Sequence, residues 1–318
     1  MLKTISRNAA KPSSQKTVFE KIKKDFRKNH TFYIMLIPLV LFYLIFHYYP
    51  MYGAQIAFKD FSVGKGILGS PWVGLKHFQT FFESIYFSRL LGNTLIINIM
   101  DIIFGFPLPV ILAILLNEVR CNAYRRTIQT VTYLPHFIST VVLCSMVKEF
   151  TTRTGLINAI IAAFGGEPIL FLQQPEWYQP MFVASGIWSE CGWSSIIYMA
   201  ALSAIDTEQY EAARIDGANR LQQMWNITLP ALLPTIVIML IIRCGKIMNV
   251  GAEKTLLLYN PSTYKTADVI ASYVYRKGIL DGDYSFSTAV GLFNSVINFI
   301  MLLSVNKISK KLTGSGLF

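Results

Sequence analysis

Long runs of apolar residues limit what this chain can fold into more than any other feature. The runs lie at about 32–49, 90–116, 128–149, 179–204, 231–250 and 285–306. Each approaches the ~20 residues that an α-helix needs to cross a bilayer. Because hydrocarbon offers no partner for a free amide or carbonyl, a helix is the form in which such a run satisfies its own backbone. The pattern predicts an all-α, polytopic membrane protein with about six transmembrane helices, kinked near Pro38, Pro107 and Pro109.

The distribution of basic residues predicts the orientation of these helices. A basic arm, residues 1–30, precedes the first run, and no small-residue cleavage site follows that run, which argues against a cleaved signal peptide. More than half of the 29 lysines and arginines fall in the arm, in 117–127, in 205–230 and in a tail, 307–318. The positive-inside rule places those segments, and both termini, in the cytoplasm, with 31–306 as the transmembrane domain. This orientation also accounts for the net charge of +11, so nucleic-acid binding is not needed to explain it. Only 15% of the residues are charged.

The sequence shows no centre for catalysis, cofactor binding or metal binding. The four cysteines and four histidines are dispersed, which argues against a disulfide framework and a metal site. No G-x-x-x-x-G-K-[ST] phosphate loop occurs, so ATP must bind elsewhere. Residues 64–69, GKGILG, fit G-x-G-x-x-G, but no clear strand precedes them and Pro71 follows, so they are interpreted as a loop. An intramembrane enzyme would need clustered acid and base groups, whereas the ionisable residues here are isolated.

Polar and aromatic residues at membrane depth are candidates for a solute path. Glu190 lies in the fourth run, and Arg243 and Lys246 share a helix face in the fifth. The alternative is that Arg243 and Lys246 sit at the outer interface or pair with a neighbouring subunit. Trp188 and Trp193 could stack on sugar rings, or could serve as interfacial anchors and bundle packing.

A polar segment, residues 205–230, separates the fourth and fifth runs and has the pattern of a helix. Asp206 is a suitable N-cap, with Gln209 three residues on. One stripe at helical spacing holds Tyr210, Ala213, Gly217, Leu221, Met224, Trp225 and Thr228. Gly217 would cost ~1 kcal/mol against Ala within a helix, so either the helix turns there or another backbone comes close. The segment could lie on the lipid surface, but it lacks a Lys/Arg-rich polar face, which favours docking into a protein groove.

This segment resembles the EAA signature of permease subunits in binding-protein-dependent ABC importers. The signature positions are Glu211, Ala212, Ala213, Gly217, Ile227, Thr228, Leu229 and Pro230. Residues 93–120, 133–140 and 251–303 also resemble sugar and oligosaccharide permeases, so about 30–318 is covered. The resemblance implies a MetI-like ABC importer permease bundle.

The resemblance also implies partners and a mechanism. In this family the EAA segment is a coupling helix that fits a cleft in a cytoplasmic ATPase subunit, so that ATP-driven motion switches the cavity between inward- and outward-facing states. Glu211 would contact the ATPase, Gly217 would give the bend, and Ile227, Leu229 and Pro230 would join the segment to the bundle. The chain itself would bind no cofactor, with ATP and Mg on two partner ATPase subunits.

The resemblance further implies a second homologous permease, with a heterodimer expected and a homodimer left open, an extracytoplasmic solute-binding protein, and a bacterial plasma membrane. The expected substrate is a carbohydrate, most simply an oligosaccharide. Two rival interpretations stay open from the residues alone, namely an importer of another solute class, and a membrane receptor or scaffold that binds a partner through the same helix.

Overall fold

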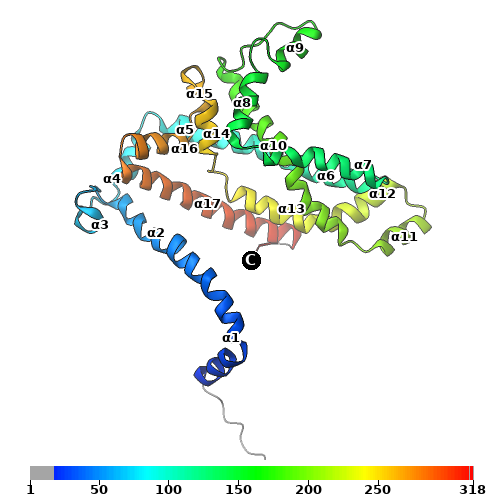
Figure 1. The fold of residues 1–318 in the computed structure, drawn as a ribbon, viewed down its shortest axis with the longest axis horizontal. Helices are drawn as coiled ribbons and strands as arrows, with labels where there is room; N and C mark the ends of the chain where they lie inside the picture. The colour runs from blue at the N-terminus through cyan, green and yellow to red at the C-terminus, as the bar shows by residue number, and fades with distance from the viewer. Residues whose placement is uncertain (1–17, 315, 318) are drawn as a thin grey trace, which may run out of the picture. The chain divides into compact units, whose positions relative to one another are not determined.

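The computed structural model describes residues 18–314, 316 and 317, and across them the fold is helical. The one β-type feature in that range is an isolated antiparallel bridge between Lys59 and Trp72. The predicted all-α class is therefore confirmed (Figure 1). The chain divides into two compact units, Met1–Gln55 and Ile56–Phe318.

The first unit is a helix whose apolar side chains are exposed on every side. It comprises α1 (Val18–Tyr43), the π-helical turn η1 (Leu44–Tyr48) and α2 (Tyr49–Met51), and the 3-10 helix η2 (Tyr52–Phe58) leads out of it. Phe32 is 74% exposed and Met35 72%. A helix that is apolar all round is covered by lipid or by protein. Its non-helical backbone lies at Asn29, not at Pro38, where the kink was expected.

Four helices among the described residues are long and apolar enough to cross a membrane. They are Asp25–Phe58, Phe87–Glu118, Arg220–Cys244 and Tyr284–Thr313. These correspond to the first, second, fifth and sixth predicted runs. The second comprises α5 (Phe87–Met100), η3 (Asp101–Gly105) and α6 (Pro107–Glu118), and the last is α17 (Tyr284–Thr313).

The third predicted run is not one straight helix. It is divided into α7 (Asn122–Tyr133), the 3-10 turn η4 (Leu134–Phe137) and α8 (Thr140–Phe150), and the two halves are bent by 102°. Pro135 ends the first half, since a proline cannot continue the hydrogen-bond ladder. Ser139 begins the second, because its hydroxyl caps α8 by accepting from the amide of Val142. Hydropathy alone could not show this bend.

The fourth predicted run is α10 (Pro175–Ser203), a helix of 29 residues and so about 43 Å long. It lies against α6, α7 and α13, and it buries Tyr178, Tyr198 and a row of serines. Because of this polar content, α10 is less apolar than the four long helices above, although it lies at the centre of the second unit. A Cβ at Gly192 would lie 2.0 Å from the carbonyl oxygen of Thr132, so α10 and α7 approach this closely only with glycine there.

π-helical turns precede three of the prolines in the spans, and the first, η1, lies just before Pro50. Residues 101–105 form η3 just before Pro107, and Met224–Thr228 form η5 just before Pro230. A wider turn relieves the clash between a proline ring and the preceding carbonyl, so the helix continues with a local distortion. This supplies the distortion that was expected at Pro107.

Residues 251–284, between the fifth and sixth predicted runs, form part of the core. They contain α14 (Ala252–Leu258), η6 (Pro261–Thr263), α15 (Tyr264–Ala267), α16 (Ile270–Tyr275) and η7 (Arg276–Leu280). Val269 and Ile270 are completely buried. Val269 packs with Tyr178 and Phe182 of α10, and Ile270 packs with Leu90 of α5.

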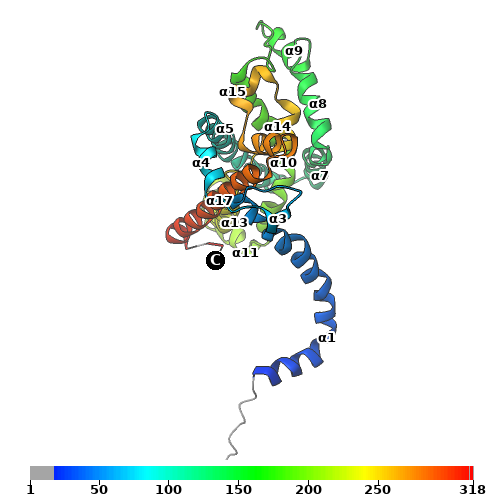
Figure 2. The ribbon, with the colours of Figure 1, turned by 90° about the vertical axis from the view of Figure 1, so that its left-hand side faces the viewer.

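Six further helices complete the second unit, and α13 is the longest of them. They are α3 (Gly66–Gly69), α4 (Lys76–Glu83) and α9 (Leu156–Ala163), followed by α11 (Thr207–Ile215), α12 (Arg220–Gln223) and α13 (Leu229–Cys244). Figures 1 and 2 show α13 beside α17. In Figure 1, α11 and α12 lie at one end of this unit and α4 and α16 at the other.

Candidate functional site

The segment 205–230, here called the coupling segment, folds as two short helices joined by a turn. The Asp206 carboxylate accepts from the amide of Glu208 at 3.0 Å and so begins α11. Gly217 has a φ of +79° and open space around it, so the helix turns there and no second backbone approaches. Of the two alternatives for this glycine, the turn is correct, since φ > 0 is costly for residues with a Cβ.

A second cap starts the next helix and was not foreseen. Asn219 and Gln222 form a reciprocal capping box, with bonds of 2.9 and 2.8 Å between side chains and amides. Gln209 was expected to complete such a box with Asp206, and it takes no part in one. The Tyr210 hydroxyl lies 3.0 Å from that of Thr228 and holds α11 against η5. The segment is therefore fixed at both ends, but it is not the single continuous stripe that was predicted.

The predicted coupling residues differ in exposure. Glu211, Ala212, Gly217 and Pro230 are exposed, and Ala213, Ile227 and Leu229 are half-buried. Among the described residues, no hydrogen bond or ion pair engages the Glu211 carboxylate. The buried anchor next to the two apolar positions is Thr228, at 1% exposure.

Three large apolar side chains of the coupling segment also face outward. Ile215 is 87% exposed, Leu221 66% and Trp225 62%. These side chains were not among the predicted site residues. Leu221 and Trp225 belonged to the predicted stripe, and Ile215 became exposed because the turn at Gly217 ends α11 beside it. An acid without a partner next to exposed apolar side chains is typical of a protein-docking surface.

A cavity of about 480 Å³ brings together most of the predicted path residues. Glu190 from α10, Arg243 from the end of α13 and Lys246 just beyond it all line this cavity. Asp101 of η3 and Lys254 of α14 join them. Lys254 was not among the predicted path residues, because it lies outside the apolar runs.

Each of the two acids in the cavity wall has a basic partner. The Asp101 carboxylate forms an ion pair with the Arg243 guanidinium. A Cβ at Gly105 would lie 2.6 Å from an Asp101 carboxylate oxygen, so the glycine leaves room for this pair. The Glu190 carboxylate lies 3.1 Å from Nδ1 of His136 in η4. Arg243 thus pairs within its own chain.

The two tryptophans lie outside this cavity. Trp188 lines a separate apolar cavity of about 430 Å³ beside α8. The Trp193 ring is stacked on His136, with ring centres 4.4 Å apart and planes within 4°. The described residues of the charged cavity offer Phe106, Phe182 and Tyr198 as aromatic rings. A role for either tryptophan on the path stays a prediction.

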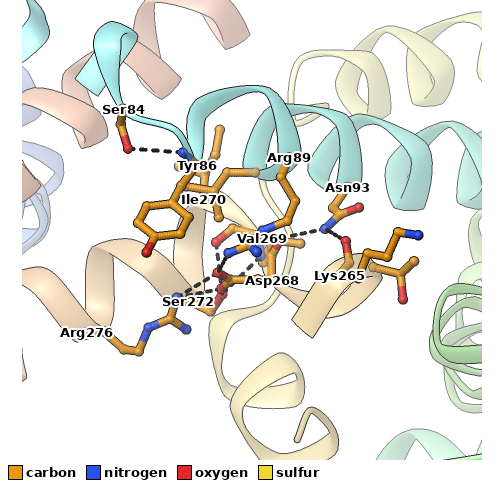
Figure 3. Close-up of polar contacts among 12 residues, drawn as sticks. Ser84, Tyr86, Arg89, Asn93, Lys265, Asp268, Val269, Ile270, Ser272 and Arg276 are labelled. Atoms are coloured by element: carbon orange, nitrogen blue, oxygen red, sulfur yellow. Dashed lines mark hydrogen bonds and ion pairs between the residues drawn. The ribbon is translucent and has the colours of Figure 1, made fainter. Parts of the chain in front are cut away.

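A buried polar cluster around Asp268 ties α5 to the segment 251–284 (Figure 3). The Asp268 side chain is 2% exposed and accepts two bonds of 2.8 Å from Arg276 and one of 3.2 Å from Arg89. Ser272 donates a further bond of 2.8 Å. Asn93 donates from α5 to the carbonyl oxygens of Lys265 and Asp268. No sequence pattern pointed to this cluster, because Arg89 and Asp268 lie far apart in the chain.

The described residues form no group of three or more His, Cys, Asp or Glu side chains that could hold a metal ion. The architecture is that of a polytopic membrane subunit with a charged cavity among its helices and a partner-free acidic helix near one end. These features define a class of membrane transport components.

Comparison with known proteins identifies the family. Residues 94–314 match the family described as binding-protein-dependent transport system inner membrane component. Protein LplB of Bacillus subtilis is 48% identical over 92% of this chain and 92% of its own length. The polygalacturonan/rhamnogalacturonan transport system permease protein YteP of the same organism is 44% identical, over 90% of this chain and 89% of its own.

A solved structure shows the same fold. One chain of a bacterial alginate ABC transporter, crystallised with an alginate pentasaccharide-bound periplasmic protein, superposes with a TM-score of 0.84. It is 42% identical and covers 92% of this chain and 99% of its own. The chain therefore belongs to the family of binding-protein-dependent transport system inner membrane components. It is the membrane-spanning permease of an ABC transporter, and ATP hydrolysis belongs to a separate subunit.

Proposed function

We propose that the chain imports a carbohydrate, most simply an oligosaccharide, across a bacterial plasma membrane. The relatives support this substrate class, since YteP is named for polygalacturonan and rhamnogalacturonan transport and the similar solved structure belongs to an alginate transporter. Both termini are placed in the cytoplasm, with 1–30 as the arm, 31–306 as the membrane domain and 307–318 as the tail. The solute enters from an extracytoplasmic binding protein.

The observation that carries the coupling mechanism is the exposed acid of α11 beside exposed apolar side chains. Glu211 lacks a partner within the described residues, and Ile215, Leu221 and Trp225 face outward nearby along the coupling segment. Such a surface fits a groove in an ATPase subunit that carries ATP and Mg. Two ATPase subunits require two such segments, which supports a second homologous permease, expected as a heterodimer.

The exposed apolar side chains of the spans support lipid and that second permease as further partners. Phe104, Phe299 and Leu115 are more than half exposed although they lie within spans. Water would penalise this exposure, whereas lipid tails or a neighbouring helix would cover it. Nucleic acid plays no part in this proposal.

The test is a charge reversal at the coupling segment. Complexes with the ATPase subunits, the second permease and the binding protein are reconstituted in proteoliposomes, and ATP-dependent uptake of labelled oligosaccharide is measured. Glu211→Lys should lower uptake by about tenfold or more, because the loss of one desolvated charge contact costs about 2 kcal/mol or more. It should also raise the fraction of ATP hydrolysis that is independent of the binding protein.

Glu167→Lys is the matched control, because Glu167 is exposed, has no partner among the described residues and lies outside the coupling segment. It should leave uptake at the level of the unsubstituted protein. Coupling through α11 is refuted if the two variants behave alike. Co-purification of a non-ATPase partner in place of the ATPase would support the receptor or scaffold alternative.

A further inference from the structure

The charges that line the cavity do not cancel. Three cationic side chains, Arg243, Lys246 and Lys254, face two acids, Asp101 and Glu190. Asp101 is paired with Arg243, and Glu190 is held by His136. The Glu190 carboxylate also acts electrostatically on Lys254, but neither Lys246 nor Lys254 forms an ion pair with a described carboxylate.

Lys254 is held in place but keeps donors to spare. Its ammonium donates to the carbonyl oxygen of Phe182 at 2.7 Å and lies 4.3 Å from the centre of the Phe182 ring. A Cβ at Gly186 would lie 3.3 Å from this nitrogen, so the bare backbone of α10 gives the amine its space. An ammonium has three N–H groups, and one bond to a carbonyl leaves two for a ligand.

Lys246 supplies a second charge. It is exposed, lines the same cavity, and its side chain has no hydrogen bond or ion pair within the described part of the chain. A neutral sugar gains little from two ammonium groups that have no counter-ion. A carboxylate, by contrast, is costly to move through a low-dielectric region unless a cation faces it.

We propose that Lys246 and Lys254 are specificity-determining residues that select oligosaccharides carrying carboxylates, that is, oligouronates. This rests on the proposed function, since it names the class of sugar that uses the same path. The two ammonium groups bind the carboxylate of a uronate residue in turn, while the Asp101–Arg243 pair keeps the third cation neutralised.

The experiment compares matched sugars in proteoliposomes that contain the complete transporter. The probes are trigalacturonate and an alginate trisaccharide, each beside its carboxyl-reduced counterpart. Replacing both lysines by glutamine should lower ATP-dependent uptake of the acidic sugars about tenfold, because hydrogen bonds to charged groups are lost. Uptake of the reduced sugars should stay unchanged. Since the binding protein is the same throughout, the difference between variants reports the permease.

Two further variants separate recognition from folding. Lys254→Arg keeps the positive charge, so arginine rather than glutamine at this position should recover most of the uptake of the acidic sugars. Lys65→Gln removes an exposed charge outside the cavity and should leave uptake unchanged. Equal losses for acidic and reduced sugars, or unchanged acidic uptake, would overturn the inference and leave carbohydrate import standing. The absence of ATP-dependent uptake for every sugar would overturn the proposed function together with the inference.

Discussion

Asp268 is expected to contribute more to stability than any exposed ion pair of this chain. Its buried carboxylate accepts from two guanidinium groups, and Asp268→Asn keeps the size of the side chain but removes the charge. Removing one partner of a buried ion pair costs about 3 to 5 kcal/mol. The Arg89 and Arg276 side chains remain 35% and 27% exposed, so water compensates in part and the lower end, about 3 kcal/mol, is expected.

The measurement is thermal unfolding followed by intrinsic tryptophan fluorescence of the purified protein. At about 2 to 4 °C for each kcal/mol, the melting temperature should fall by about 6 to 12 °C. Arg89 Nε and Arg276 Nη1 already lack hydrogen-bond partners among the described residues, so the loss of the carboxylate adds to donors that are already unsatisfied. Arg276→Gln, added to Asp268→Asn, should recover part of the loss because one uncompensated guanidinium is removed.

Asp281→Asn is the matched control. Asp281 bonds to Lys277 at 2.8 Å, but the two side chains are 52% and 41% exposed. Such pairs are worth about 0 to 1 kcal/mol, so the melting temperature should fall by at most about 4 °C. If Asp268→Asn and Asp281→Asn shift the melting temperature equally, the reasoning from burial is refuted.

Two other substitutions test packing and capping. Gly192→Ala should destabilise the protein by about 1 to 3 kcal/mol, because its Cβ would meet the Thr132 carbonyl. Gly92→Ala is the control, because Gly92 has open space around it and the substitution should not destabilise the protein. Thermal melting separates the two variants, and equal shifts of the melting temperature would contradict the close approach of α7 and α10. Asn219→Ala should lower the stability of the coupling segment by about 1 kcal/mol, because the cap of α12 is lost. Hydrogen exchange of the α12 amides should become faster. Asn226→Ala, in the turn after α12, is the control and should leave the exchange of the α12 amides unchanged.

The sequence predicted the parts of this fold that depend on local pattern. Apolar runs located the long helices, and Asp206 and Gly217 correctly marked the start and the turn of the coupling segment. The bend between α7 and α8 was missed because Pro135 and Ser139 lie inside one apolar run, and hydropathy does not register a change of direction.

The packing of the segment 251–284 could not be predicted, for a different reason. Its helices are short and lie outside the long apolar runs, and they become core only through contacts with α5 and α10 far away in the chain. Asp268 and Lys254 acquire their roles from that packing. Glu190, Arg243 and Lys246 could be predicted as a group because each is an ionisable residue in an apolar run, but their common cavity depends on how α10 and α13 cross.

The helix from Arg220 to Cys244 runs without a loop over 25 residues, about 37 Å. Its N-terminal part, as far as Pro230, belongs to the coupling segment, and Arg243 in its last turn lines the cavity. In the proposed mechanism, a push on α12 would reach Arg243 along this one continuous helix, which contains the π-helical turn at Met224–Thr228 and Pro234. A lever of this kind converts a small rotation at its base into a larger sideways displacement at its tip, where Arg243 meets Asp101.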